Sequence, residues 1–235
     1  MTKLKPNEQQ AKAVIITLWT VLALYIASLI SAILQYNLFQ TIASGGYVSE
    51  QVAKANDIRV GIVALFLLIS YIVLAITFLM WFRRAYYNLH QKVSSLSHSV
   101  GWAVGCWFVP LMNLYRPFQI MKEMYDETQK LINGRELSKR VDYTTTYVGW
   151  WWTFWIITGI LNGIAWRFER NAFTINDFIA VTTFDIVIYA TSIILTLFAI
   201  KVVRDYSKVE PLLNEIKDEE QQVAETLTEK TDNAL

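Results

Sequence analysis

The chain has 235 residues, of which 54% are hydrophobic and only 17% are charged. Soluble domains carry roughly a quarter charged residues, so this composition argues against an ordinary soluble protein and favours one that lies in a membrane. The net charge of +1 provides no basic field for nucleic acid, and the single cysteine excludes an intrachain disulfide.

Four apolar segments are long enough to cross a bilayer. A helix rises about 1.5 Å per residue, so about 20 residues cover a hydrocarbon core about 30 Å thick. Lipid offers no partner to backbone N–H and C=O groups, so segments that cross it are predicted to be helices. The first segment exceeds the apolar core of a signal peptide, which has about 7–15 residues, and we expect it to be retained. The predicted spans are residues 14–34, 62–82, 147–166 and 178–200.

The positions of the Lys and Arg residues predict the orientation of these spans. Membrane proteins keep an excess of Lys and Arg in their cytoplasmic loops. Four crossings place 17 of the 21 Lys and Arg residues on one side, together with both termini and the segment between the second and third spans. Both termini and that middle segment are therefore expected in the cytoplasm.

The middle segment contains a stretch, GWAVGCWFVPLMNLYRP, that is nearly as apolar as a span but is interrupted by prolines. A crossing at residues 100–116 would carry the six Lys and Arg residues of 116–140 to the outside, against the charge distribution. Pro110 removes a backbone donor and clashes with the preceding turn, and Pro117 does the same. We expect a short helix that ends near Val109, a bend at Pro110, and a segment that is either re-entrant or lies in the membrane interface.

Residues 117–133 carry apolar side chains at helical spacing on one face and charged side chains elsewhere, which predicts an amphipathic helix. Its apolar face lies either on the membrane or against the spans. Residues 206–235 form a polar, acidic tail. The predicted fold is all-α, a single membrane domain over residues 1–205. It is an integral membrane four-helix bundle with a short Pro-broken re-entrant or interfacial helix and a cytoplasmic amphipathic helix.

Two neighbouring motifs carry a resemblance to a known family. RRAYYNLH is followed, after a short spacer, by GWAVGCWFVPLMNLYRPFQIMKEMY, and the order and spacing within this block, from Trp81 to Tyr125, are distinctive. The block resembles a bacterial membrane family called domain of unknown function 4328, with Cys106 as a departure from the family pattern. The resemblance implies a bacterial source and a location in the inner membrane. It implies no activity, substrate or cofactor.

The sequence lacks the common catalytic and cofactor motifs. It contains no P-loop, no Gly-rich dinucleotide turn, and neither the G-x-S-x-G nor the H-E-x-x-H pattern. His90 and His98 have no cysteines or carboxylates at metal-ligand spacing and are expected at the surface or the membrane interface. We therefore expect no catalytic, cofactor or metal site, and a protein that is not an enzyme.

Polar residues in and beside the spans are the remaining candidates, because ionisable groups at membrane depth are costly and usually functional. One set is either a proton or cation relay, or a site for a small polar substrate, or a structural cluster that ties the last two spans together. This set is Asp185, Asn162, Arg167 and Arg59. A second set, at the cytoplasmic face, is expected to contact lipid or a partner: Arg83, Arg84, Trp102, Trp107, Asn113 and Arg116.

Three functions are compatible with these patterns. The first is a non-enzymatic protein that binds membrane lipid, a membrane protein partner or a second copy of itself through the re-entrant and amphipathic region. The second is a small transporter or channel that uses a polar site around Asp185. Discontinuous helices build such sites in carriers, but no internal repeat is visible here. The third is a membrane enzyme that acts on lipid.

Overall fold

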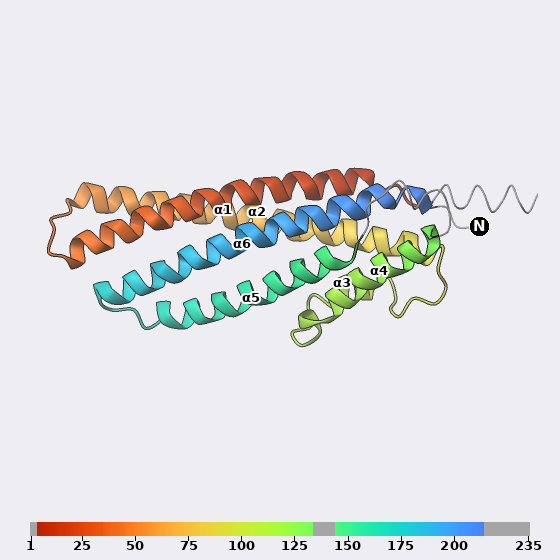
Figure 1. Cartoon of the computed structure of the whole chain (residues 1–235). Coiled ribbons are helices and arrows are strands. Elements are labelled where there is room, and N and C mark those ends of the chain that lie inside the picture. The colour runs from red at the N-terminus through yellow and green to blue at the C-terminus, as the bar shows by residue number, and fades with distance from the viewer. Residues whose placement is uncertain (1–3, 134–143, 214–235) are drawn as a thin grey trace, which may run out of the picture. The chain divides into compact units, whose positions relative to one another are not determined.

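The structure, a computed structural model, describes residues 4–133 and 144–213. In those two ranges every regular element is a helix, and the helices are labelled in Figure 1. A short 3-10 helix, η1 (Met112–Leu114), lies between α3 and α4. The α-helices are α1 (Glu8–Ala43), α2 (Glu50–His90), α3 (Trp102–Gly105), α4 (Arg116–Ile132), α5 (Thr146–Glu169) and α6 (Ile175–Val209).

Each of the four predicted spans lies within one helix, so the predicted all-α fold is confirmed. α1, α2 and α6 are long and apolar enough to cross a membrane. α5 contains the predicted span 147–166 but is not one of these three. A crossing by α5, and with it the four-helix bundle, stays a prediction.

The three candidate spans are longer than a bilayer requires. α1, α2 and α6 have 36, 41 and 35 residues. At a rise of 1.5 Å per residue they are about 54, 62 and 53 Å long. They extend beyond the predicted spans because the Gln, Glu, Lys and Arg residues at their ends are good helix formers in water. α6 continues to Val209, past the predicted start of the tail at residue 206, and Tyr206 is buried. Residues 214–235 of that tail lie outside the described part of the chain.

The chain divides into two compact units, a finer division than the single membrane domain expected over residues 1–205. The span unit comprises residues 12–78 and 146–202. α1, α2 and α6 contribute residues to both units. The terminal unit comprises, among the described residues, 4–11, 79–133, 144–145 and 203–213.

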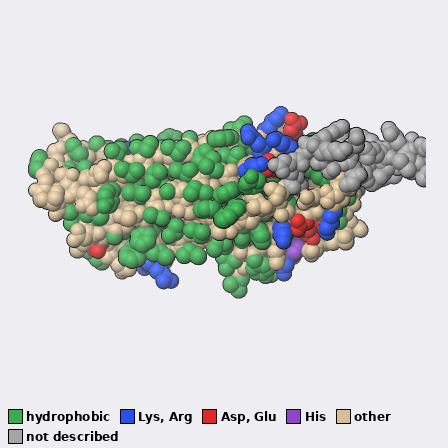
Figure 2. All heavy atoms as spheres, in the orientation of Figure 1, with side chains coloured by type: hydrophobic (Ala, Val, Ile, Leu, Met, Phe, Trp, Pro, Cys, Tyr) green, Lys and Arg blue, Asp and Glu red, His purple; other side chains and the backbone are tan. Residues whose placement is uncertain are grey.

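The span unit exposes apolar side chains on a large scale. Along α2, residues from Ile62 to Ile76 expose isoleucine, leucine, phenylalanine, tyrosine and valine side chains on several faces. Hydrophobic side chains are also spread widely over the visible face of the long helices (Figure 2). A helix that is apolar all round is suited to lipid rather than to water. The unit packs internally through a stripe on α1 that includes Val14, Leu18 and Val21.

The terminal unit has a buried core of the kind found in soluble proteins. α2 contributes Trp81, Phe82 and Tyr86 to it, all fully buried. α4 is amphipathic as predicted, and its apolar face is buried in this unit. The apolar face of residues 117–133 is therefore covered by protein. The buried residues of α4 are Pro117, Ile120, Met121, Met124, Tyr125, Thr128 and Ile132.

The Pro-broken segment contains no helix long enough to cross a bilayer. α3 ends at Gly105 rather than near Val109, and residues 106–111, which include Pro110, form no regular helix. Pro117 does not break a helix, because it lies in the first turn of α4, where the backbone N–H has no helical partner to lose. The bend is thus longer than expected, and whether the segment is re-entrant or in-plane stays open.

Candidate functional site

The most exposed apolar residues of the terminal unit lie between α3 and α4. Phe108 is 72% exposed and Leu111 is 76% exposed, and Val109, Leu114 and Tyr115 are exposed as well. We call these five residues the apolar tip. Large apolar side chains that gather on a surface mark contact with a membrane or with another protein.

The residues before the tip anchor it to the core of the terminal unit. Ala103 and Cys106 are buried, and the Trp107 ring meets the Phe82 ring edge to face, with 6.4 Å between the centroids. Burial raises the pKa of the Cys106 thiol to about 11, so the thiol stays protonated and acts as a small apolar group. The exposed tip therefore follows directly on residues 103–107, which are held in the buried core.

A network of polar side chains joins the end of α2, the loop that follows it and the first turns of α4. Tyr86 donates its hydroxyl hydrogen to Glu123 Oε2 at 2.8 Å and accepts the His98 backbone N–H at 3.3 Å. His90 Nε2 lies 2.8 Å from the His98 carbonyl oxygen, which only accepts, so Nε2 carries the hydrogen. We call Tyr86, His90, Ser97, His98, Arg116, Gln119 and Glu123 the histidine network.

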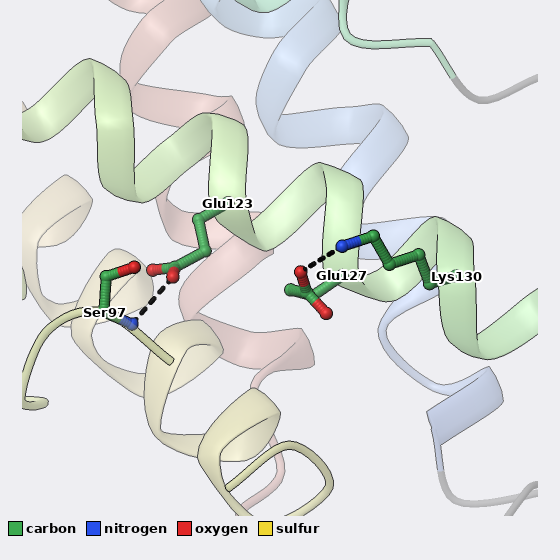
Figure 3. Close-up of polar contacts among 4 residues, drawn as sticks. All are labelled: Ser97, Glu123, Glu127 and Lys130. Atoms are coloured by element: carbon green, nitrogen blue, oxygen red, sulfur yellow. Dashed lines mark hydrogen bonds and ion pairs between the residues drawn. The ribbon is translucent and has the colours of Figure 1, made fainter. Parts of the chain in front are cut away.

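Glu123 is the acid of the histidine network. Its Oε1 accepts the Ser97 backbone N–H at 2.7 Å, and Figure 3 shows the two residues facing each other. Burial pushes the pKa of Glu123 up, but the hydrogen bonds from Ser97 and Tyr86 outweigh burial and lower it overall. Glu123 is therefore a carboxylate at neutral pH. Further along α4, Glu127 and Lys130 form a separate exposed ion pair of 2.7 Å (Figure 3).

Arg116 and His98 form the cationic part of the network. Arg116 Nη1 lies 2.8 Å from His98 Nε2 and 3.1 Å from Gln119 Oε1. A guanidinium only donates, so His98 Nε2 is the acceptor and the ring hydrogen is on Nδ1. Nδ1 is buried and has no hydrogen-bond partner among the described residues. The described carboxylates form no ion pair with Arg116 either, so its charge is balanced by none of them.

An open depression on the surface of α4 borders the network. Its volume is about 560 Å³, and it carries side chains of both charges. Gln119 and Glu123, which belong to the histidine network, form part of its wall beside Lys122. The polar groups of the network therefore lie next to a space that a polar ligand can enter.

Comparison with known families places the chain. The sequence model of a family described as Domain of unknown function (DUF4328) matches residues 45–208. The chain belongs to the DUF4328 family. This match confirms the resemblance found in the block from Trp81 to Tyr125 and extends it from the start of α2 nearly to the end of α6. A comparison with curated proteins gives no match, and neither does one with solved structures.

In this DUF4328 protein the residues predicted to contact lipid or a partner divide into two groups. Arg83 and Trp102 are exposed, as such a role requires. Arg84 Nη1 instead donates to the Pro6 carbonyl at 2.8 Å. The other three are partly buried: Trp107 directly before the tip, Arg116 in the histidine network, and Asn113 with a buried Oδ1 that has no partner among the described residues.

The four predicted intramembrane residues do not bond to one another. Arg59 donates to Ser31 Oγ at 3.1 Å and to Asn56 Oδ1 at 2.6 Å, so it joins α1 to α2. Asn162 donates to the Thr158 carbonyl of its own helix at 2.7 Å. Within the described chain Asp185 and Arg167 form no hydrogen bond or ion pair. Arg59 and Asn162 thus bond to near neighbours on their own helix or the next one, and the four residues form no shared site through direct bonds.

A second buried polar cluster of the DUF4328 protein was not predicted. Glu210 is 7% exposed, and its carboxylate accepts from Asn88 Nδ2 at 2.7 Å and from Asn7 Nδ2 at 3.0 Å. Asn88 also exchanges two bonds of 2.8 Å with the backbone of Lys5. Burial raises the pKa of Glu210, which these amide bonds and Arg84 offset in part. This cluster fastens the N-terminal segment to the ends of α2 and α6.

The histidine network corrects the expectation that His90 and His98 are plain surface residues, because both are half-buried and bonded. Spacing in the sequence carries part of the signal. Tyr86 and His90 are one helical turn apart, and residues 116, 119 and 123 follow one face of α4. The tertiary fold decides that these faces of α2 and α4 pack against each other. Local spacing in the sequence does not predict that contact.

Proposed function

We propose that this protein is a multi-pass, non-enzymatic inner-membrane protein that binds lipid by inserting its apolar tip into the cytoplasmic leaflet. Both termini and the segment between α2 and α5 lie in the cytoplasm in this proposal. The observation that carries it is the exposure of Phe108 and Leu111 on a segment rooted in a buried core.

The choice of lipid as the occupant follows from the rest of the chain. Three helices are long and apolar enough to cross a membrane, which supports a bilayer as the apolar medium that receives the tip. Burial of apolar surface contributes roughly 25 cal/mol per Å², which favours insertion of several large side chains together. The excess of Lys and Arg in the same segment supports the cytoplasmic leaflet, where anionic lipids attract cations.

A label on the tip tests the proposal. In a Cys106→Ala background, Leu111→Cys carries an environment-sensitive fluorophore, and the protein is reconstituted in nanodiscs. We expect a blue-shifted emission that is quenched by lipids brominated on the acyl chain. Ser95→Cys, at an exposed polar loop position of the same unit, is the matched control and should report water. A water-like signal at position 111 contradicts the proposal, and a dry signal without quenching indicates a protein partner instead.

The same control variant tests the orientation. Ser95 lies in the loop after α2, on the proposed cytoplasmic side. Ser95→Cys should react with a membrane-impermeant maleimide in inside-out vesicles and stay unreacted in right-side-out vesicles. The opposite pattern would place the tip on the other face of the membrane.

A further inference from the structure

We propose that His98 and Arg116 form a binding site for the phosphate of an anionic phospholipid, and that protonation of His98 opens this site. The inference rests on the proposed function, because it assigns a lipid headgroup to the polar side of the apolar tip. It also states when the headgroup binds.

With neutral His98 the site is closed. Arg116 Nη1 is engaged by His98 Nε2 at 2.8 Å and by Gln119 Oε1 at 3.1 Å. The guanidinium carries five N–H donors, and the described carboxylates form no ion pair with it. Arg116 therefore keeps an uncompensated charge and spare donors while its position is fixed by a neutral ring.

Protonation of His98 turns its contact with Arg116 from attractive to repulsive. His98 Nε2 then carries a hydrogen that points at another donor, so the 2.8 Å bond to Arg116 is lost and two cations are left side by side. The backbone of His98 stays in place, because Tyr86 holds its N–H and His90 holds its carbonyl. The change is therefore confined to the two side chains.

The groups that face His98 from each packed element favour this reading. α2 presents Tyr86 and His90, and α4 presents Arg116 and Glu123. Glu123 is the one acid among them, and its oxygens are already bonded to Ser97 and Tyr86. Its bonds are directed at those two groups, so an external anion is needed to pair with the released Arg116.

A phosphate on a lipid meets this requirement best. Arg116 directly follows Tyr115, the last residue of the apolar tip, and its guanidinium lies 5.1 Å from the Tyr115 ring centroid. A tip inserted among acyl chains brings the next residue to the level of the phosphates. Arginine binds phosphate through paired N–H donors, so the released guanidinium suits a lipid phosphate at that level.

The test measures lipid selectivity at two pH values. The full-length protein is placed in nanodiscs of phosphatidylcholine with or without phosphatidylglycerol, and retained lipid is counted by native mass spectrometry. We expect roughly fivefold stronger retention of phosphatidylglycerol at about pH 5.5 than at about pH 8, because one added cation near an anionic surface has about that effect. Equal retention at both pH values overturns the inference.

Three variants separate the roles of the residues. His98→Gln keeps an acceptor for Arg116 but gains no charge, so it should hold retention at the level of about pH 8 at both values. Arg116→Gln should lose the preference for phosphatidylglycerol altogether. His90→Gln, the matched control, keeps a donor for the His98 carbonyl and should leave the pH dependence intact. Loss of the pH dependence in His90→Gln alone would overturn the assignment to His98.

Two further readouts keep the alternatives apart. The label at position 111 should be inserted in lipid at both pH values. If the label is not inserted at either pH, the proposed function is refuted. If the label is inserted but phosphatidylglycerol is retained equally at both pH values, only the further inference is refuted. Addition of excess inorganic phosphate should not displace the retained lipid, since the free ion lacks the acyl chains that hold it at the tip. Displacement would show a site for soluble phosphate and overturn the lipid assignment.

Discussion

The two parts of α2 treat similar side chains in opposite ways. Phe66, in the span unit, is 56% exposed, whereas Phe82, in the terminal unit, is fully buried on the same helix. Both parts are rich in apolar residues, so composition alone does not distinguish them. The first part exposes apolar side chains, as a helix suited to lipid does, whereas the second buries them in a packed core.

Polar side chains also behave differently in the two units: they bond locally in the span unit and over long sequence separations in the terminal unit. In the span unit most threonine hydroxyls donate to the carbonyl four residues earlier on their own helix, as those of Thr77 and Thr191 do. In the terminal unit polar groups bond across long sequence separations, as Asn88 does with Glu210. A span in lipid must satisfy its groups locally, while a packed domain can use them to fix one arrangement of its elements.

The largest effect is expected from truncation of the two phenylalanines. Phe82→Ala should destabilise the terminal unit by about 3–5 kcal/mol, or roughly 10 °C in Tm, because the ring leaves a cavity against Trp81 and Trp107. Phe66→Ala should cost less than about 1 kcal/mol, since lipid chains fill the space that the ring leaves. Thermal unfolding in nanodiscs measures both. Equal losses would show that α2 is packed alike along its length.

A smaller effect is expected from two asparagines. Asn88→Ala leaves the buried Glu210 carboxylate without its shortest hydrogen bond and frees the backbone of Lys5, at a cost of about 2–3 kcal/mol. Asn162→Ala removes only a bond within α5 and should change stability by about 0.5 kcal/mol or less. Limited proteolysis should also cut faster near Lys5 in Asn88→Ala. A stable N-terminus in that variant contradicts the fastening role of the cluster.

Sequence patterns predicted the features that depend on local chemistry. The four apolar segments and the amphipathic helix at 117–133 follow from hydropathy and spacing, and each lies in a helix. The patterns did not show that α2 continues to His90. A fall in hydropathy along the sequence marks the point where a span would leave the membrane, and a helix can continue beyond that point. Asp185 looked important because acids are rare in spans, yet two of its predicted partners, Arg59 and Asn162, bond elsewhere.

The residues that matter most to the proposals were the hardest to predict. Phe108 and Leu111 read as ordinary apolar residues, and only the break between α3 and α4 makes them exposed. Tyr86 and Glu123 meet although 37 positions separate them. Such pairs depend on how α2 and α4 pack, and packing is decided by the complete core rather than by any one segment.

The smallest effect concerns pH, and it separates two acids of the terminal unit. Burial raises the pKa of Glu210, and the bonds from Asn88 and Asn7 offset that rise only in part. An acid whose folded pKa is raised contributes stability below its unfolded value, about 4.3, and loses that contribution as pH rises through the folded value. Glu123 has the opposite sign, because bonds from Ser97 and Tyr86 lower its pKa despite burial.

The variants Glu210→Gln and Glu123→Gln resolve these two contributions. Wild-type Tm should fall as pH rises above about 4.3 toward neutrality, and Glu210→Gln should flatten that part of the profile. Glu123 contributes stability above its unfolded value and loses it as pH falls through the lower, folded one, so Glu123→Gln should flatten only the acid end. Thermal unfolding between about pH 3.5 and 7 covers both windows around the ordinary glutamate value. If the Glu210→Gln profile ran parallel to wild type, Glu210 would be an acid whose charge costs nothing to bury. The bonds from Asn88 and Asn7 would then fully replace its hydration.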